Sequence, residues 1–218
     1  MIRRMPKSHK QKLVQMTELC IDKKYLDERE NIKKENGSVV HIIVSGRLIY
    51  RKGIQVLLEA VTKMNPLHNY KVDIYGDGDQ RALLEGFVKK SGLENRVIFH
   101  GNIPFDEMQN AYRNADIYVL PSLRESTGTA VFEALANKLP VITFNQNGAK
   151  YIVESDAGIL IDLNDKEQVL IDLAKALDTL VDNYELRRAY GECGFNKLKN
   201  QYTWDKRAEQ MARVYENL

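Results

Sequence analysis

Residues 39–61, VVHIIVSGRLIYRKGIQVLLEAV, decide the fold. The stretch begins with an apolar run at 39–44 that shows little polar alternation, as is typical of a strand buried on both faces. A turn follows at 45–53. Beyond it, apolar residues recur at the helical spacing i, i+3, i+4 and i+7, namely Ile54, Leu57, Leu58 and Val61. The stretch therefore predicts a strand, a turn and an amphipathic helix.

The same alternation recurs along the chain. Further runs rich in β-branched and aromatic residues lie at 72–75, 97–99, 117–120, 141–144 and 159–161. Helical stripes are formed by Leu83, Leu84, Phe87 and Val88, by residues 108–112, by Leu170, Leu173, Leu177 and Leu180, and by Trp204, Ala208, Met211 and Tyr215. About six such repeats predict an α/β fold. This is a Rossmann-like doubly wound parallel sheet of about six strands, with helices on both faces and additional C-terminal helices.

Two helix starts carry recognisable caps. Asn164 followed by Glu167 predicts a capping box, and Thr203 is expected to cap the last helix. Within the first strand, His41 is expected to be a core histidine.

Composition excludes several classes of protein. The 218 residues include 32 Lys+Arg and 30 Asp+Glu, a formal net charge of +2, which argues against nucleic-acid binding. Cys20 and Cys193 lack CxxC partners, which excludes a disulfide framework or a zinc module. No apolar run approaches the ~20 residues that cross a bilayer, and the N-terminus lacks the apolar stretch of a signal peptide. We expect a cytoplasmic protein with at most peripheral contact at the inner face of a membrane.

The first 37 residues differ in composition from the rest. Residues 1–35 contain ten Lys/Arg and six Asp/Glu without a glycine, and residues 1–37 are predicted to form a polar helix or linker. Acidic residues interleave with the basic ones, which favours a solvated segment over a membrane-binding one. Residues 38–218 are expected to form one domain with C-terminal helices.

The turns after the predicted strands contain the candidate ligand-binding residues. They read SGRLIYRKG, YGDGD, HGNIP, LPSLRESTGT and FNQNGAK, and in a parallel sheet they meet at one edge, where ligands bind. Gly46 and Gly76 are expected to let the backbone approach a ligand closely. Arg47 and Lys52, beside a predicted helix start, suit a diphosphate. The alternative interpretation is two solvated loop cations.

The sequence gives little support for a metal-binding site or a dinucleotide-binding site. Gly76 and Gly78 begin a dinucleotide fingerprint, but Arg81 replaces its third glycine, which argues against a dehydrogenase. No DxD-like pair or His/Asp cluster is placed to hold a divalent cation, so we predict no metal and no cofactor. Asp77 and Asp79 are expected to shape their turn.

Residues 121–140, PSLRESTGTAVFEALANKLP, contain Glu125 in a loop and Glu133 two helical turns further on. Helical periodicity turns Glu133 away from Val131 and Leu135, toward the small residues Thr129, Ala130 and Ala136. A carboxylate there can hold vicinal hydroxyls, and backbone N–H groups near Gly128 can face an anion. For an isolated residue, an exposed helix glutamate is the alternative.

Taken together, these motifs resemble the family 4 glycosyltransferases of the GT-B fold. The resemblance rests on GRLIYRKG, YGDG, VIFHG, ADIYVLPSLRES, EALANKLPVIT, the pair Glu125-x7-Glu133 and the closing YTW…VY segment. It runs from about residue 39 to 218 and covers their C-terminal, nucleotide-sugar-binding domain. The segment STGTAVFEALANKLPVI is similar to the corresponding sequence of bacterial enzymes that build exopolysaccharides and other surface glycans.

The resemblance implies a role for each matching residue. Arg47 and Lys52 neutralise the donor diphosphate, Glu133 holds the ribose hydroxyls, and Glu125 lies beside hydroxyls of the donor sugar. Backbone amides of Gly128, Thr129 and Ala130 approach the sugar and phosphates, and the base lies near His100 to Ile103. A structural role for His100 stays open. Ser126 and Thr127 stand where many members have glycine after the first glutamate, which leaves the donor sugar undefined.

The implied reaction is glycosyl transfer, with retention, from a nucleotide diphosphate sugar, UDP-linked by expectation, to an acceptor sugar or lipid-linked glycan. The acceptor-binding half has no counterpart in residues 1–37. We therefore expect the chain alone to bind nucleotide weakly and to transfer little sugar. Three explanations stay open: an isolated piece of a longer enzyme, a fragment from a split gene, or a subunit that borrows its other half from a partner chain. The alternatives are a non-catalytic nucleotide-sugar-binding subunit and another GT-B enzyme, such as an epimerase or a phosphorylase.

Overall fold

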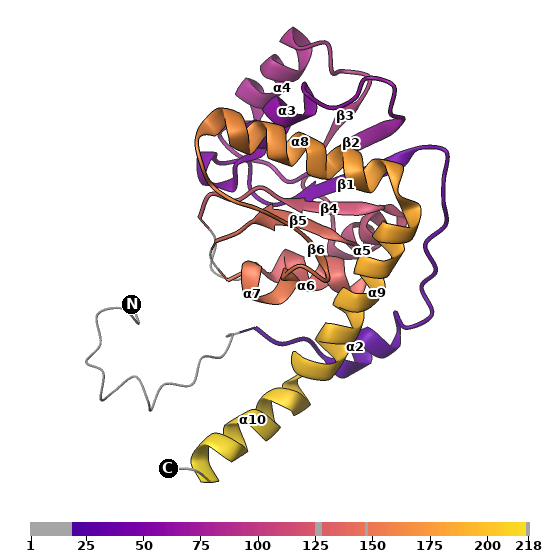
Figure 1. The fold of residues 1–218 in the computed structure, drawn as a ribbon, viewed down its shortest axis with the longest axis vertical. Coiled ribbons are helices and arrows are strands. Elements are labelled where there is room, and N and C mark those ends of the chain that lie inside the picture. Colours follow the sequence, from indigo (N-terminus) through magenta and orange to yellow (C-terminus); the bar gives the residue numbers. More distant parts are fainter. Residues whose placement is uncertain (1–18, 125–127, 147, 217–218) are drawn as a thin grey trace, which may run out of the picture.

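A computed structural model of the chain describes residues 19–124, 128–146 and 148–216. Six parallel strands form one sheet in the order β3-β2-β1-β4-β5-β6 (Figure 1). Their bounds are β1 Val40–Ser45, β2 Tyr70–Tyr75, β3 Val97–Gly101, β4 Ile117–Leu120, β5 Val141–Phe144 and β6 Gly158–Ile161. The predicted Rossmann-like, doubly wound α/β fold is confirmed.

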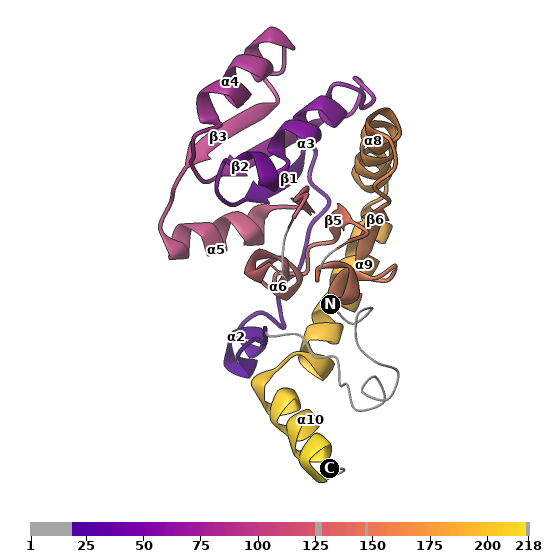
Figure 2. The same cartoon turned by 90° about the vertical axis from the view of Figure 1, so that its left-hand side faces the viewer.

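Helices cover both faces of the sheet (Figures 1 and 2). On one face lie α3 (Ile54–Val61), α4 (Arg81–Lys90) and α8 (Lys166–Asp182). On the other lie α5 (Phe105–Asn114), α6 (Thr129–Ala136), α7 (Lys150–Val153) and α9 (Tyr184–Gln201). The remaining helices are α2 (Lys23–Asp27), α10 (Trp204–Glu216) and the single 3-10 turn Tyr50–Lys52.

The helices bury two hydrophobic layers against the sheet. Leu57, Leu58 and Leu177 are fully buried in the layer under α3 and α8, and Val131 and Leu135 are fully buried in the layer under α6. Every residue of β4 and β5 is buried. Strands enclosed on both faces need apolar side chains in both directions, which explains why their sequences do not alternate.

Two expectations about helix faces and caps were wrong. The capping box at Asn164 does not form, because Asp165 is the N-cap of α8 and its carboxylate accepts a 3.1 Å hydrogen bond from the Gln168 N–H. On α4, Leu83 is 58% exposed, whereas Leu84 and Val88 are buried. The buried stripe of this helix is therefore narrower than predicted, since residues four apart share one face.

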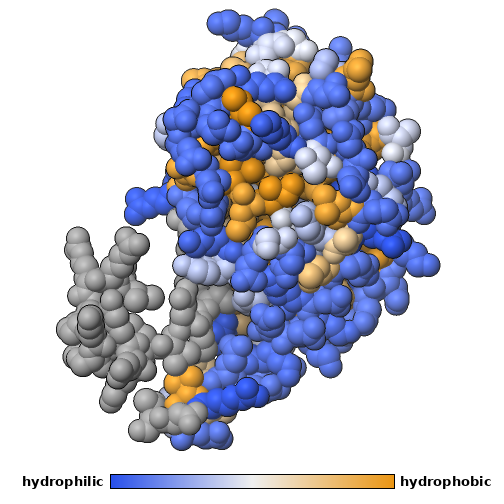
Figure 3. Space-filling model, viewed as in Figure 1, coloured by the Kyte–Doolittle hydropathy of each residue, from blue (hydrophilic) through white to orange (hydrophobic). Residues whose placement is uncertain are grey.

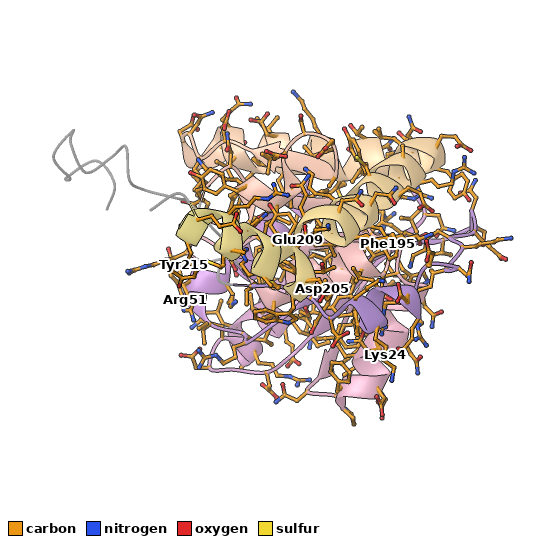
Figure 4. All side chains as sticks on the ribbon, turned by 90° about the horizontal axis from the view of Figure 1, so that it is seen from below. Lys24, Arg51, Phe195, Asp205, Glu209 and Tyr215 are labelled. Carbon is orange, nitrogen blue, oxygen red and sulfur yellow. The ribbon has the colours of Figure 1, made fainter. Side chains whose placement is uncertain are left out.

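The last helix leaves the body of the molecule. Thr203 caps α10 as predicted, with its hydroxyl oxygen 3.3 Å from the Lys206 N–H. The expected apolar stripe of α10 is not buried against the described chain: Trp204 is 57% and Tyr215 67% exposed. In Figure 4 α10 lies toward the viewer, with Tyr215 near its outer end.

Residues 19–37 lie against the domain. Leu26 on α2 is fully buried, Arg29 is 3% exposed, and Ile21 forms a parallel bridge with Thr203 beside the start of α10. The Lys34 ammonium donates to backbone carbonyl groups at the end of α5. The first 18 residues of the predicted linker lie outside the described chain.

The visible surface is mostly polar. Figure 3 shows hydrophilic residues over most of the face seen in Figure 1, with hydrophobic ones gathered near its centre. Within the described ranges, no helix combines the length and apolarity that a membrane crossing requires.

Candidate functional site

The first three turns are joined at the carboxyl edge of the sheet, which faces the viewer in Figure 2. The Gly46 N–H donates to the Tyr75 carbonyl at 2.9 Å, and the Gly76 N–H donates to the Gly101 carbonyl at 2.7 Å. The turns after β1, β2 and β3 therefore form one continuous rim, as the predicted parallel order requires.

Two glycines in this rim allow neighbouring backbones to touch. At Gly76, with φ +125°, a Cβ would lie 2.0 Å from the Gly46 carbonyl oxygen. At Gly53, with φ +67°, a Cβ would lie 1.9 Å from the carbonyl oxygen of Pro121, in the loop after β4. Any larger residue would displace these segments, so both positions require glycine. In this structure each glycine approaches another turn of the same chain.

The two predicted cations share the turn after β1. Arg47 is exposed, and Lys52 is half-buried in the 3-10 turn that leads into α3. A Cβ placed on Gly46 would lie 4.0 Å from Lys52 Nζ, so this ammonium lies over the end of β1. The arrangement places both positive charges at the rim, where the N-terminus of α3 adds its partial positive charge.

Among the described residues, none is seen to accept from the first two N–H groups of α6. Gly128 is the N-cap residue, with φ +79°, and no side chain caps the helix. Thr129 and Ala130 are the first two residues of α6, so their N–H groups have no acceptor within the helix. Glu125, Ser126 and Thr127 lie outside the described residues.

Glu133 lies on α6 and is half-buried. Burial raises the pKa of its carboxyl, while a hydrogen bond with Tyr112 and the charge of Arg29 act in the opposite direction. Val131 and Leu135 are fully buried against the sheet as predicted, but Ala136, which was expected on the open side with Glu133, is also fully buried. Glu133 is less exposed than an isolated surface glutamate.

Sequence reasoning missed the groups that surround Glu133. The Tyr112 hydroxyl on α5 lies 2.8 Å from Ser45 Oγ, and Tyr112 lowers the pKa of Glu133. Arg29, which comes from the segment predicted to be a linker, lowers that pKa as well. These residues are far apart in the chain. The only sequence signals for this group of residues were the helical stripe that includes Tyr112 and the position of Ser45 at the end of a strand.

His41 is not a core histidine. Its side chain is 45% exposed, and its Nδ1 lies 3.0 Å from Asp73 Oδ2. Asp73 Oδ1 lies 2.7 Å from His100 Nε2, and the His100 ring stacks on Tyr75 with centroids 4.3 Å apart. The pKa of His41 is raised, and the largest cause is its hydrogen bond to Asp73. The prediction failed because the face of the sheet at these strands is only partly covered.

His100 therefore has a structural partner at the end of β3. Ile103 in the following turn is half-buried. In the turn after β2, the Asp77 carboxylate accepts from the Gly78 N–H at 2.7 Å and pairs with Arg81 at 3.1 Å, which confirms that Asp77 shapes the loop. Among the described residues, no three His, Cys, Asp or Glu side chains gather as metal ligands would.

The fold and its rim define a Rossmann-like α/β domain, a class whose ligands bind beyond the carboxyl ends of the strands. The sequence profile of the glycosyl transferases group 1 family matches residues 27–197, and the chain belongs to this family. An uncharacterized glycosyltransferase of Methanocaldococcus jannaschii is 30% identical over 175 residues, which are 80% of this chain and 44% of that protein.

Solved structures share the fold. The C-terminal domain of a group 1 glycosyl transferase from Francisella tularensis superposes with a TM-score of 0.67 at 26% identity, over 84% of this chain and 94% of that domain. A pneumococcal O-GlcNAc transferase in complex with UDP and GlcNAc gives a TM-score of 0.69 at 22% identity, over 81% of this chain and 35% of that protein. The chain spans less than half the length of the curated relatives it matches.

Proposed function

We propose that this chain is the donor-binding half of a retaining glycosyltransferase of family 4. In this proposal it binds a nucleotide diphosphate sugar, UDP-linked, at the carboxyl edge of the sheet. The observation that carries the proposal is the joined rim of turns in which Arg47 and Lys52 share the turn after β1. Membership of the group 1 glycosyl transferases supports the transferase chemistry.

The proposed chemistry is displacement of a nucleoside diphosphate. The anomeric C–O bond breaks and its electron pair leaves with the diphosphate. An acceptor hydroxyl forms the new C–O bond and passes its proton to the departing diphosphate. Negative charge therefore develops on the diphosphate. Arg47, Lys52 and the first N–H groups of α6 stabilise that charge, and removal of one such donor costs about 10²–10³-fold in rate. No metal ion or cofactor takes part.

The remaining roles are those that the resemblance to the family 4 glycosyltransferases implies. Glu133 accepts hydrogen bonds from the ribose hydroxyls, and Glu125 lies beside the hydroxyls of the donor sugar. The base lies beside the turn that holds His100 and Ile103. The pneumococcal relative of known structure holds UDP and GlcNAc, which supports a uridine nucleotide as the donor to test first.

The acceptor is a sugar or a lipid-linked glycan of a bacterial surface polysaccharide, and the reaction takes place in the cytoplasm or at the inner face of the membrane. Because the relatives are more than twice as long as the matched region, we propose that transfer needs an acceptor-binding half in addition to the residues described here. A second candidate is a non-catalytic nucleotide-sugar-binding subunit, which would bind its ligand at the same rim of turns.

Calorimetric titration tests the proposed donor site. The chain is titrated with UDP, GDP and ADP and with their common sugar conjugates. We expect the uridine series to bind, and Arg47→Ala and Lys52→Ala each to weaken binding about tenfold, as loss of a charged hydrogen bond does. Lys63→Ala is the control, because Lys63 pairs with Glu167 beyond the other end of α3. Failure of every nucleotide to bind would overturn the proposal.

The same purified chain separates the two candidates. Mixed with donor and acceptor glycans, it is expected to transfer little or no sugar by itself. Co-purification with a protein that restores transfer would identify the missing half. Robust transfer by the chain alone would contradict its assignment as a half enzyme.

A further inference from the structure

The last residues of β3 do not follow the regular ladder of the sheet. β3 lies at one edge, where β2 is its neighbour (Figure 2). Ile74 of β2 pairs with Phe99, but the next residue, Tyr75, pairs with Gly101. His100 is therefore an extra residue in the ladder, as in a β-bulge, a feature that redirects a side chain or a strand end. The turn after β3 thus begins where main-chain pairing is interrupted.

A buried carboxylate holds this extra residue. Asp73 of β2 is buried, and its Oδ1 lies 2.7 Å from His100 Nε2. The His100 ring stacks on the Tyr75 ring, with the centroids 4.3 Å apart and the ring planes 7° from parallel. The His100 side chain is still 31% exposed. One edge and one face of the imidazole are therefore fixed, while part of the ring stays open to solvent.

The ionisation of Asp73 determines the direction of this hydrogen bond. Burial acts to raise the pKa of Asp73, but the hydrogen bonds with His41 and His100 outweigh it and the pKa is lowered. The carboxylate is therefore ionised at neutral pH and only accepts, so His100 Nε2 carries the hydrogen. The other oxygen, Oδ2, lies 3.0 Å from His41 Nδ1 on β1. The three side chains thus connect three adjacent strands, and His41 holds Asp73 from the side opposite to His100.

A main-chain hydrogen bond joins the same strand end to the rim. The Gly101 carbonyl accepts from the Gly76 N–H at 2.7 Å, and Gly101 has a left-handed φ of +72°. Residues 101–103 therefore leave the sheet from two fixed points, the main chain of Gly76 and the side chain of Asp73. In the proposed function, this turn lies beside the base of the nucleotide.

We propose that Asp73 is a positioning residue for the nucleotide base: through His100 it fixes the end of β3, so that the turn at 101–103 meets the base in one conformation. The inference rests on the proposed function, which puts the base at this turn. Asp73 acts through His100 because it is buried and lies two residues before the end of β2. A turn that is fixed before the nucleotide arrives loses less conformational entropy on binding, which increases affinity.

The test compares UDP with ribose 5-diphosphate, which has the ribose and the diphosphate but no base. Isothermal titration calorimetry of the wild-type chain is expected to show tighter binding of UDP. Asp73→Ala is expected to weaken UDP binding by about three- to tenfold and to leave ribose 5-diphosphate binding unchanged, since only the base depends on this turn. Asp178→Ala is the matched control, because it removes a carboxylate 2.9 Å from His68 Nδ1, before the start of β2 and thus at the opposite edge of the sheet.

Imidazole ¹⁵N NMR gives a measurement that does not depend on the nucleotide. The hydrogen of His100 is expected on Nε2 in the wild type and in exchange between both nitrogens in Asp73→Ala. A wild-type His100 with its hydrogen on Nδ1 alone overturns the inference. So does an unchanged UDP affinity in Asp73→Ala, or an equal loss of affinity for both ligands, which would indicate general loosening of the fold.

The wild-type titrations separate failure of this inference from failure of the proposed function. If the wild type binds neither ligand, the proposed donor site fails and the inference fails with it. If it binds both equally tightly, the donor site stands, but the base is not recognised and the inference alone fails. Should Asp73→Ala not fold, Asp73→Asn keeps the size of the side chain and is expected to weaken UDP binding selectively, but by less.

Discussion

Gly76 lies against Gly46 so closely that a Cβ on Gly76 would be 2.0 Å from the Gly46 carbonyl oxygen. The contact joins the turn after β2 to the turn after β1, which contains Arg47 and Lys52. Hydrogen bonds from Gly46 to Tyr75 and from Gly76 to Gly101 hold the same rim together. The position of the two cations therefore depends on a backbone contact that only glycine permits.

The first prediction concerns this contact. Gly76→Ala is expected to lower the free energy of unfolding by about 3 kcal/mol or more, since it combines a clash with a strained φ of +125°. Gly86→Ala is the control: Gly86 lies on α4 with no atom within 4 Å of the added methyl group, and the change is expected to stabilise by about 0.5–1 kcal/mol. Urea denaturation measures both. Equal stability of the two variants would contradict the argument.

The second prediction concerns Asp73, whose two oxygens bond to His41 and His100. Burial alone would raise the pKa of Asp73, but the two histidine hydrogen bonds outweigh it and the pKa is lowered. A carboxyl group with a lowered pKa adds stability that is lost as pH falls through that pKa. His41 has a raised pKa, so its contribution is lost as pH rises through it. Both contributions are present between about pH 4 and 6.5.

Asp73→Asn is therefore expected to destabilise most in that range. The loss near pH 5.5 is about 1–2 kcal/mol, since His41 is 45% exposed and solvent screens its pairing. The difference between wild type and variant is expected to shrink toward pH 8 and toward pH 3. Thermal unfolding at several pH values measures it, with Asp79→Asn as the exposed control. A difference independent of pH would show that the histidine pairs do not contribute as described.

The sequence was sufficient for the sheet because buried strands have a strong local signal. The runs at 117–120 and 141–144 agree with β4 and β5 to the residue, since each is enclosed on both faces. The cap of α8 was misplaced because Asn164 and Asp165 are adjacent residues that both favour N-caps. Local sequence gives no reason to prefer one, and the backbone geometry selects Asp165.

The surroundings of the candidate site could not be predicted in the same way. Tyr112 meets Ser45 across 67 residues of chain, and this pairing depends on how α5 packs over β1. His41 was misassigned because an apolar run predicts burial, whereas the cover over each strand depends on where the crossover helices lie. Arg47, Lys52 and Glu133 could be predicted as site residues because each stands at a fixed offset from a strand or helix end, and their roles stay predictions.

The third prediction concerns the attachment of residues 19–37. The Lys34 ammonium donates to the carbonyl groups of Tyr112, Arg113 and Ala115 at 3.0, 2.7 and 2.8 Å. Lys34→Met leaves the last carbonyl groups of α5 without this donor, and we expect a loss of about 1–3 kcal/mol and faster proteolysis within residues 19–37. Lys33→Met, at the exposed neighbouring position, is the control. Equal cleavage rates in the two variants would contradict a fastening role for Lys34.

The last prediction separates leaving-group stabilisation from nucleotide binding. In the complete enzyme, Arg47→Ala is expected to lower kcat by about 10²–10³-fold, because in the proposed function its guanidinium stabilises the negative charge that increases on the diphosphate as the C–O bond breaks. Glu133→Ala is expected mainly to raise the KM for the donor, because the ribose hydroxyls are bound alike in the ground and transition states. Steady-state kinetics with the donor nucleotide sugar measure both. Turnover and donor affinity in Arg47→Ala equal to those of the wild type would remove Arg47 from the site.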